Sequence, residues 1–159
     1  MRFRTTAGRM RNGLLSVAMC LTTGAQAAQS PAPLPPPRPP SPYSCEMVGA
    51  ERLSGSRVDV VYRVMPEPIT VGKHFSIVML VCPHAGVTAP ASVVLDATMP
   101  EHRHGMNYKP RVTFEYGGRQ GYRYRAEGMM FHMGGIWELK IEVRAGGGTD
   151  RLTRRIAVD

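Results

Sequence analysis

Cysteine is scarce in this chain of 159 residues, which contains only three. Cys20 lies in the N-terminal segment, so Cys45 and Cys82 are the two that remain beyond it. Neither has a Cys-x-x-Cys partner, and in an oxidising compartment such a pair predicts a disulfide, with two thiolate metal ligands as the alternative. Closing this loop would stabilise the fold by about 3–4 kcal/mol in the chain-entropy model.

A long apolar segment is also lacking. The apolar run at 13–25 is too short, and too poor in strong hydrophobes, to span a bilayer comfortably. A basic stretch with four arginines precedes it, and Ala25-Gln26-Ala27 follows as a cleavage motif. We therefore expect a signal peptide at 1–27, a periplasmic or secreted location, and no membrane span after cleavage.

Acidic residues are few, but the resulting basic excess does not indicate a nucleic-acid partner. The chain has 20 basic and 12 acidic residues, and four of the arginines lie in the signal, which leaves 16 − 12 = +4. No basic run is interleaved with aromatic residues, as a nucleic-acid surface would require. We expect no nucleic-acid binding.

Proline is concentrated in one place. The segment 28–42 includes "SPAPLPPPRPPSP", a composition typical of an extended polyproline II linker without a core of its own. The predicted organisation is a signal peptide (1–27), a Pro-rich linker (28–42) and a β-sandwich domain (43–159).

No helical period persists over three turns in this domain, whereas period-two alternation recurs. Trp137, Leu139 and Ile141, for example, alternate with charged residues, and Trp137 is expected to fix the core. Similar segments, separated by glycine and proline clusters, fall at 57–65, 74–82, 91–99, 111–116, 121–128, 136–143 and 151–158. The pattern predicts an all-β fold, an immunoglobulin-like antiparallel β-sandwich of seven or eight strands.

The stretch "MPEHRHGM", 99–106, combines histidine and methionine, whose imidazole and thioether groups suit soft metals. His102, His104 and Met106 are two residues apart, so on an extended segment their side chains would share one face. Met99 ranks lower because it precedes Pro100 and belongs to the strand end. The alternative is an ordinary solvated turn, which Pro100 also favours.

A second stretch, "GMMFHMGGIW" at 128–137, carries the same residue types. Three of the 11 methionines lie in the signal, and five of the other eight fall between 99 and 133, together with three of the five histidines. If Phe131 points inward, His132 and Met130 line a rim; His132 is therefore the strongest ligand candidate of this stretch, with Met130 and Met133 below it. The remaining histidines, His74 and His84, are expected on the surface.

The two stretches, continued as "MPEHRHGMNYKPRV" and "YRAEGMMFHMGGIWELKIEV", resemble the YtkA-like/FixH-like family of small exported β-sandwich domains. The resemblance covers roughly Ser56 to Val143. It implies an immunoglobulin-like fold and an association with copper handling or oxidase assembly. His104, Gly105 and Met106 occupy its motif positions, and His102 extends the motif.

Two functions follow as hypotheses. The first is a periplasmic copper-binding protein, a chaperone or buffer that delivers to a copper-receiving envelope protein. Its metal ligands are His102, His104 and Met106, completed by His132 or a nearby methionine; Cu(I) is favoured and Cu(II) is the alternative. The second is a non-metal structural or interaction module of the cell envelope. An enzyme is not expected, since no catalytic triad, nucleophile elbow or phosphate loop occurs.

Overall fold

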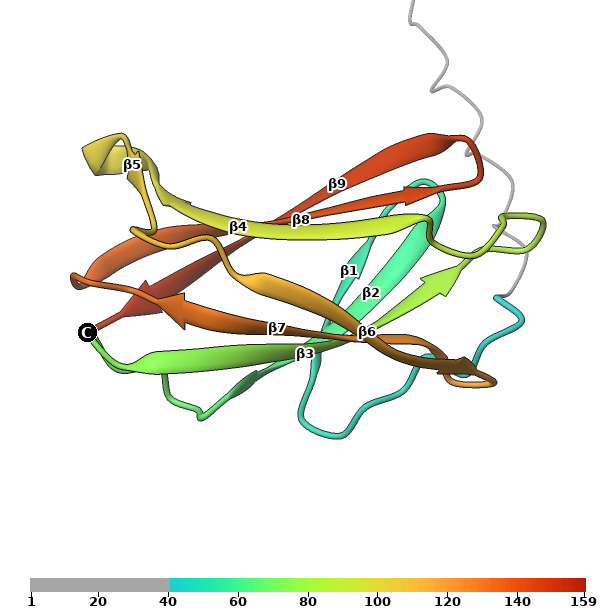
Figure 1. Ribbon diagram of the computed structural model, residues 1–159, viewed down its shortest axis with the longest axis horizontal. Helices are drawn as coiled ribbons and strands as arrows, with labels where there is room; N and C mark the ends of the chain where they lie inside the picture. The colour runs from blue at the N-terminus through green and yellow to red at the C-terminus, as the bar shows by residue number, and fades with distance from the viewer. Residues whose placement is uncertain (1–40) are drawn as a thin grey trace, which may run out of the picture. The chain divides into compact units, whose positions relative to one another are not determined.

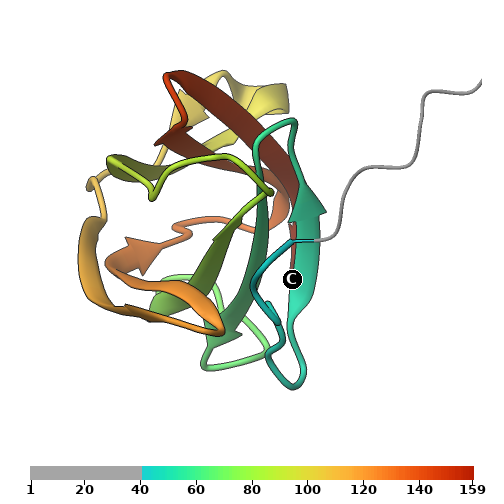
Figure 2. The same ribbon diagram turned by 90° about the vertical axis from the view of Figure 1, so that its right-hand side faces the viewer.

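Alternating apolar residues build two antiparallel sheets that face each other (Figures 1 and 2). The computed structural model describes residues 41–159; the predicted signal peptide and most of the Pro-rich linker lie outside them. One sheet has the strand order β1 (Glu51–Ser54), β2 (Val58–Met65), β3 (His74–Pro83), β7 (Gly121–Met130), β6 (Arg111–Gly118). The other has the order β5 (His104–Gly105), β4 (Ser92–Met99), β8 (Gly135–Ala145), β9 (Gly148–Val158).

The predicted all-β sandwich is confirmed, and all seven segments with clear alternation form strands. The predicted number of strands, seven or eight, is wrong, because the described residues form nine. The two additional strands, β1 and β5, have four and two residues, which is too short for a period of two to be recognised. The helical content of the described residues is one short 3-10 turn, η1 (Pro100–His102).

The core lies between the sheets and is formed by the inward residues of each strand. In β8, Trp137, Leu139 and Ile141 are fully buried, whereas the charged residues between them are not. Burying each large apolar side chain contributes about 1.5–3 kcal/mol, so this row adds directly to the stability of the core. The inward position predicted for Trp137 is confirmed.

The two long sides of the sandwich are closed differently. On one side β1 lies against β9, where Arg154 Nε is 2.8 Å from Glu51 Oε2 and the hydroxyl of Tyr62 donates to the same carboxylate. Burial raises the pKa of the Tyr62 phenol, and the negative charge of Glu51 raises it further. On the other side, β6 and most of β4 are the outer strands of their sheets.

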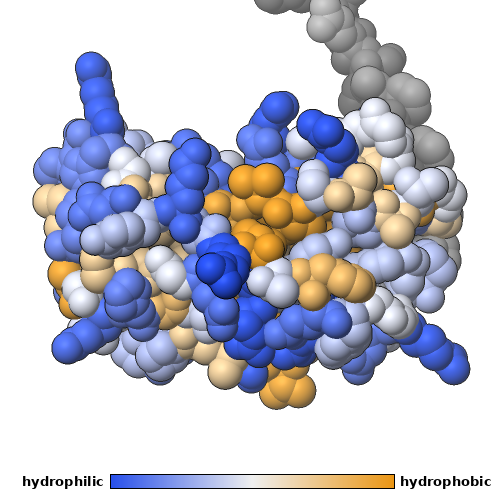
Figure 3. Space-filling view, viewed as in Figure 1, coloured by the Kyte–Doolittle hydropathy of each residue, from blue (hydrophilic) through white to orange (hydrophobic). Residues whose placement is uncertain are grey.

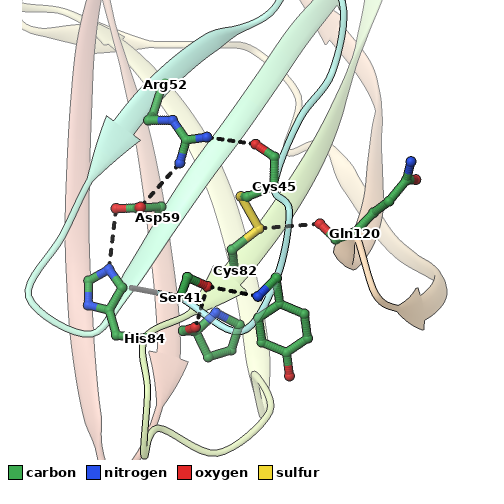
Figure 4. Close-up of a disulfide and its surroundings, with 9 residues drawn as sticks. Ser41, Cys45, Arg52, Asp59, Cys82, His84 and Gln120 are labelled. Carbon is green, nitrogen blue, oxygen red and sulfur yellow. Dashed lines mark hydrogen bonds and ion pairs between the residues drawn. A yellow bond between two sulfur atoms is a disulfide. The ribbon is translucent and has the colours of Figure 1, made fainter. Parts of the chain in front are cut away.

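A disulfide joins Cys45 to Cys82, as predicted, with a Cα–Cα distance of 6.0 Å. It fastens residues 41–50, here called the strap, to the outer face of β2 and β3, where the strap covers Val61 and Leu80 (Figures 2 and 4). Ser41 Oγ also donates to the carbonyl of Pro83. Within residues 41–159, no helix has the length and apolar character needed to cross a membrane.

Buried polar groups near the strap are well hydrogen-bonded. His84 is only 6% exposed, which makes its predicted surface position wrong; its Nδ1 lies 3.2 Å from Ser56 O and its Nε2 3.3 Å from Asp59 Oδ1. Burial raises the pKa of the Asp150 carboxyl, but hydrogen bonds outweigh this and leave the pKa lowered. The donors are Ser56 Oγ and the backbone N–H groups of Arg57 and Val58.

Candidate metal centre

The first histidine stretch forms a tight reversal at the end of β4. Pro100 starts η1, and Arg103 follows in the left-handed region with φ of 54°. Left-handed backbone at a non-glycine residue costs about 1–2 kcal/mol, so the surrounding contacts must impose it. The chain then turns back as β5, in which His104 pairs with Met99. The predicted extended segment is therefore wrong at His102, which belongs to η1, and holds only for His104 and Gly105, since β5 ends before Met106.

The second stretch forms the turn between β7 and β8. Met129 and Phe131 are fully buried, whereas Met130 and His132 are half-buried, so the condition under which His132 and Met130 line a rim, an inward Phe131, is met. A hydrogen bond from the core fixes this turn: the indole Nε1 of Trp137 donates to the carbonyl of Met133 at 3.0 Å.

The fold brings these two stretches together at one end of the sandwich. This end is on the left of Figure 1, where β5 lies above the turn that connects the two sheets through β7 and β8. The ring centroids of His104 and His132 are 5.0 Å apart, and those of His102 and His104 are 5.8 Å apart. Residues separated by 28 positions thus become neighbours.

Both members of the closer pair have a buried nitrogen without a partner. Among the described residues, three buried side-chain N or O atoms have no hydrogen-bond partner: Arg63 Nε, His104 Nε2 and His132 Nδ1. Leaving such an atom unpartnered costs about 1–3 kcal/mol, so native structures rarely do so without a reason. Two of these three atoms lie in adjacent imidazoles, which we call the imidazole pair (His104 and His132).

An aromatic floor supports the imidazole pair. The rings of Phe131 and Trp137 are stacked with centroids 4.4 Å apart and an angle of 8° between planes. The Trp137 ring lies 6.0 Å from His104 and 5.4 Å from His132, edge-on to both. This supporting role of Trp137 was not predicted from the sequence, which indicated only a core position.

The methionines occupy three kinds of position. Met106 and Met133 are half-buried and pack against the edge of the core. Met130, also half-buried, ends β7 opposite His74 of β3, an exposed residue as predicted. Met99 is 1% exposed, and its Cε lies 2.9 Å from where a Cβ on Gly135 would be. Met106, Met130 and Met133 are thus all partly exposed, and Met106 and Met133 also pack against the core.

The spacing of the imidazole pair fits two ligands of one metal ion. An imidazole centroid lies about 3.1 Å from an ion bound at about 2 Å, so two ligating rings have centroids about 5–6 Å apart. Residues 41–159 contain no group of three or more His, Cys, Asp or Glu side chains that could hold a metal ion. The soft donors at this end of the sandwich are instead mixed: two imidazoles, with the half-buried Met106 and Met133 two and one residues along the chain from them.

Comparisons with known proteins give little further information. No protein-family model matches this chain, and no curated protein is similar to it. The chain is similar to a solved structure of a DUF4426 family protein from Pseudomonas aeruginosa, with 17% identity and a TM-score of 0.45. The similarity covers 70% of this chain and 97% of that one. We draw no conclusion from a similarity at this level.

Proposed function

We propose that this chain is an exported copper-binding protein that holds Cu(I) through the imidazole pair and adjacent methionine sulfur. The observation that carries the proposal is that His104 Nε2 and His132 Nδ1 are buried without partners in rings 5.0 Å apart. A bound cation would supply what both nitrogens lack. Imidazole and thioether donors together suit a soft ion of low charge, which favours Cu(I) over Cu(II).

The surroundings support a carrier rather than a structural metal site. The Cys45–Cys82 disulfide already consumes both thiols of the described region, so thioether and imidazole are the soft donors left in an oxidising compartment. His104 follows a short turn and His132 lies within one, and ligands on loops can change partners more readily than ligands on long strands. A periplasmic chaperone or buffer of the YtkA-like/FixH-like kind, delivering to a copper-receiving envelope protein, combines these features.

Anaerobic competition titration tests the proposal. The purified chain would be titrated against the coloured Cu(I)–bicinchoninate complex, with Trp137 fluorescence as a second signal because its ring lies within 6.0 Å of both imidazoles. We expect one Cu(I) per chain, and a loss of about 100-fold or more in affinity for His104→Gln and for His132→Gln.

His74→Gln is the matched control, because it removes an exposed imidazole from β3, outside the imidazole pair. We expect its affinity to stay within about twofold of the unsubstituted chain, as for an uninvolved surface residue. Equal Cu(I) affinity in all four proteins would remove the basis of the proposal.

A second candidate function is a non-metal interaction module, and one surface feature favours it. Between β4 and β6, apolar atoms gather in the middle of the face shown in Figure 3. On these strands Val94, Phe114 and Tyr116 are each about half exposed, at 55%, 53% and 45%. Apolar patches beside outer strands are typical of partner surfaces. Retention of partner binding in a His104→Gln/His132→Gln variant that no longer binds copper would favour this candidate.

A further inference from the structure

The three histidines at this end of the sandwich form a row that runs from solvent into the protein. His102 is exposed at the tip of η1, whereas His104 and His132 are half-buried. Successive ring centroids are 5.8 Å and 5.0 Å apart. The unpartnered buried nitrogens belong to the inner two rings. Position and burial therefore separate the outer histidine from the imidazole pair.

His102 also differs from the pair in what it could do in this arrangement. His102 is exposed and, unlike the pair, has no buried unpartnered nitrogen that a metal ion would satisfy, so we treat it as separate from the pair. Its ring centroid nevertheless lies only 5.8 Å from that of His104. An ion on His102 would need to move only a few ångströms to reach the pair, since metal–nitrogen bonds are about 2 Å.

We propose that His102 is the exchange ligand through which copper passes between a soft-donor carrier and the imidazole pair. This inference rests on the proposed function and assigns a partner class to it: an envelope protein or small molecule that holds Cu(I) by thiolate or thioether sulfur. In each transfer one Cu–S bond to the carrier breaks as the Cu–Nε2 or Cu–Nδ1 bond to His102 forms. That bond breaks in turn as the pair takes the ion. Copper stays Cu(I) throughout, and imidazole binds the ion in its neutral form.

The local surface suits such a handover. Glu101, His102 and Arg103 are all exposed at the tip, so a carrier can approach His102 without displacing the core. Arg103 in its left-handed conformation reverses the chain between His102 and His104, which places the two rings on successive steps of the row. The turn thus leaves His102 exposed while its ring stays 5.8 Å from that of His104.

Stopped-flow transfer of Cu(I) from a methionine-rich peptide, a thioether carrier, tests this inference at physiological ionic strength, with Trp137 fluorescence reporting uptake and bicinchoninate capture reporting release. For His102→Gln we expect the rates of Cu(I) uptake and release to fall by about tenfold each. His102 is tethered beside the pair, so an ion bound to it is present at a high effective concentration near the pair. Equilibrium affinity should change by less than about twofold, since both rates fall together. His132→Gln should instead lose affinity. Glu101→Gln, at the same tip but without loss of an imidazole, should change neither.

The outcomes separate the two proposals. If the unsubstituted chain takes no Cu(I), the proposed function fails, whatever His102 does. If it binds Cu(I) and His102→Gln weakens affinity as much as His132→Gln, His102 is a permanent ligand and the exchange role is wrong. Unchanged rates in His102→Gln, with wild-type binding, would also overturn the exchange role while leaving copper binding intact.

Discussion

Histidine nitrogens are buried at both ends of this sandwich, but only at one end do they have hydrogen-bond partners. Near the strap, His84 lies against Ser56 O with one nitrogen and Asp59 Oδ1 with the other. At the other end, His104 and His132 each keep a buried nitrogen without a partner. The strand β3 connects the two ends over ten residues, about 30 Å at the usual rise. One protein thus contains a histidine placed for stability and two placed at a cost to stability.

The same contrast extends to the other polar groups. Asp59 near the strap also pairs with Arg52, whose guanidinium donates to the carbonyl of Cys45 beside the disulfide (Figure 4). Asp150 accepts hydrogen bonds from Ser56 and two backbone N–H groups. A fully satisfied network of this kind rigidifies its surroundings. The strap end thus satisfies its polar groups within the fold, whereas the imidazole pair leaves two nitrogens unsatisfied, as the proposed copper site would require.

Removing the disulfide should produce the largest effect on stability. Cys45→Ala/Cys82→Ala is expected to lower the free energy of unfolding by about 3–4 kcal/mol, because the cross-link restricts the unfolded chain. Urea denaturation under oxidising conditions measures this, with the intact protein under reducing conditions as a parallel sample. If the ends are independent, Cu(I) affinity in native buffer stays unchanged; a parallel loss of affinity would show that the strap supports the metal centre.

His84→Leu tests the satisfied histidine. The substitution removes two contacts and leaves the Ser56 carbonyl without its imidazole partner, so we expect a loss of about 1–3 kcal/mol in the free energy of unfolding. Asp59 keeps Arg52 as a partner and should limit the damage. Equilibrium denaturation gives the value, and Cu(I) titration serves as the control. Stability equal to that of the unsubstituted chain would remove the contrast between the ends.

Much of the fold could be predicted because each strand buries one face. In β8, apolar and charged residues alternate from Trp137 to Val143, and the structure buries the apolar ones. The disulfide was predictable from the number of cysteines. The strands β1 and β5 were not, since two to four residues carry no readable period. These two strands form because their backbones pair with β2 and β4, and not because of a pattern in their own residues.

The candidate site was predictable in its residue types but less so in its geometry. The concentration of His and Met in two turns is visible in the sequence, yet which imidazoles meet depends on the sandwich bringing 104 next to 132. The left-handed conformation of Arg103 places His102 outside the extended segment that was expected. An arginine gives no indication of that conformation in the sequence. His84 was misplaced for a related reason: its partners Ser56 and Asp59 are 28 and 25 residues away. A buried, satisfied histidine and an exposed one look alike in sequence.

The smallest expected effect on stability is the most informative, because His132→Leu should not cause the loss expected of His84→Leu. His132→Leu fills the same space without a buried unpartnered nitrogen, so the free energy of unfolding without metal should stay level or rise by up to about 1 kcal/mol. Paired denaturation curves of His132→Leu and His84→Leu measure the difference, and Cu(I) titration of His132→Leu should show the loss of affinity that accompanies it. Binding residues that cost stability are retained for what they bind. A loss above about 1 kcal/mol would instead make His132 a structural residue like His84.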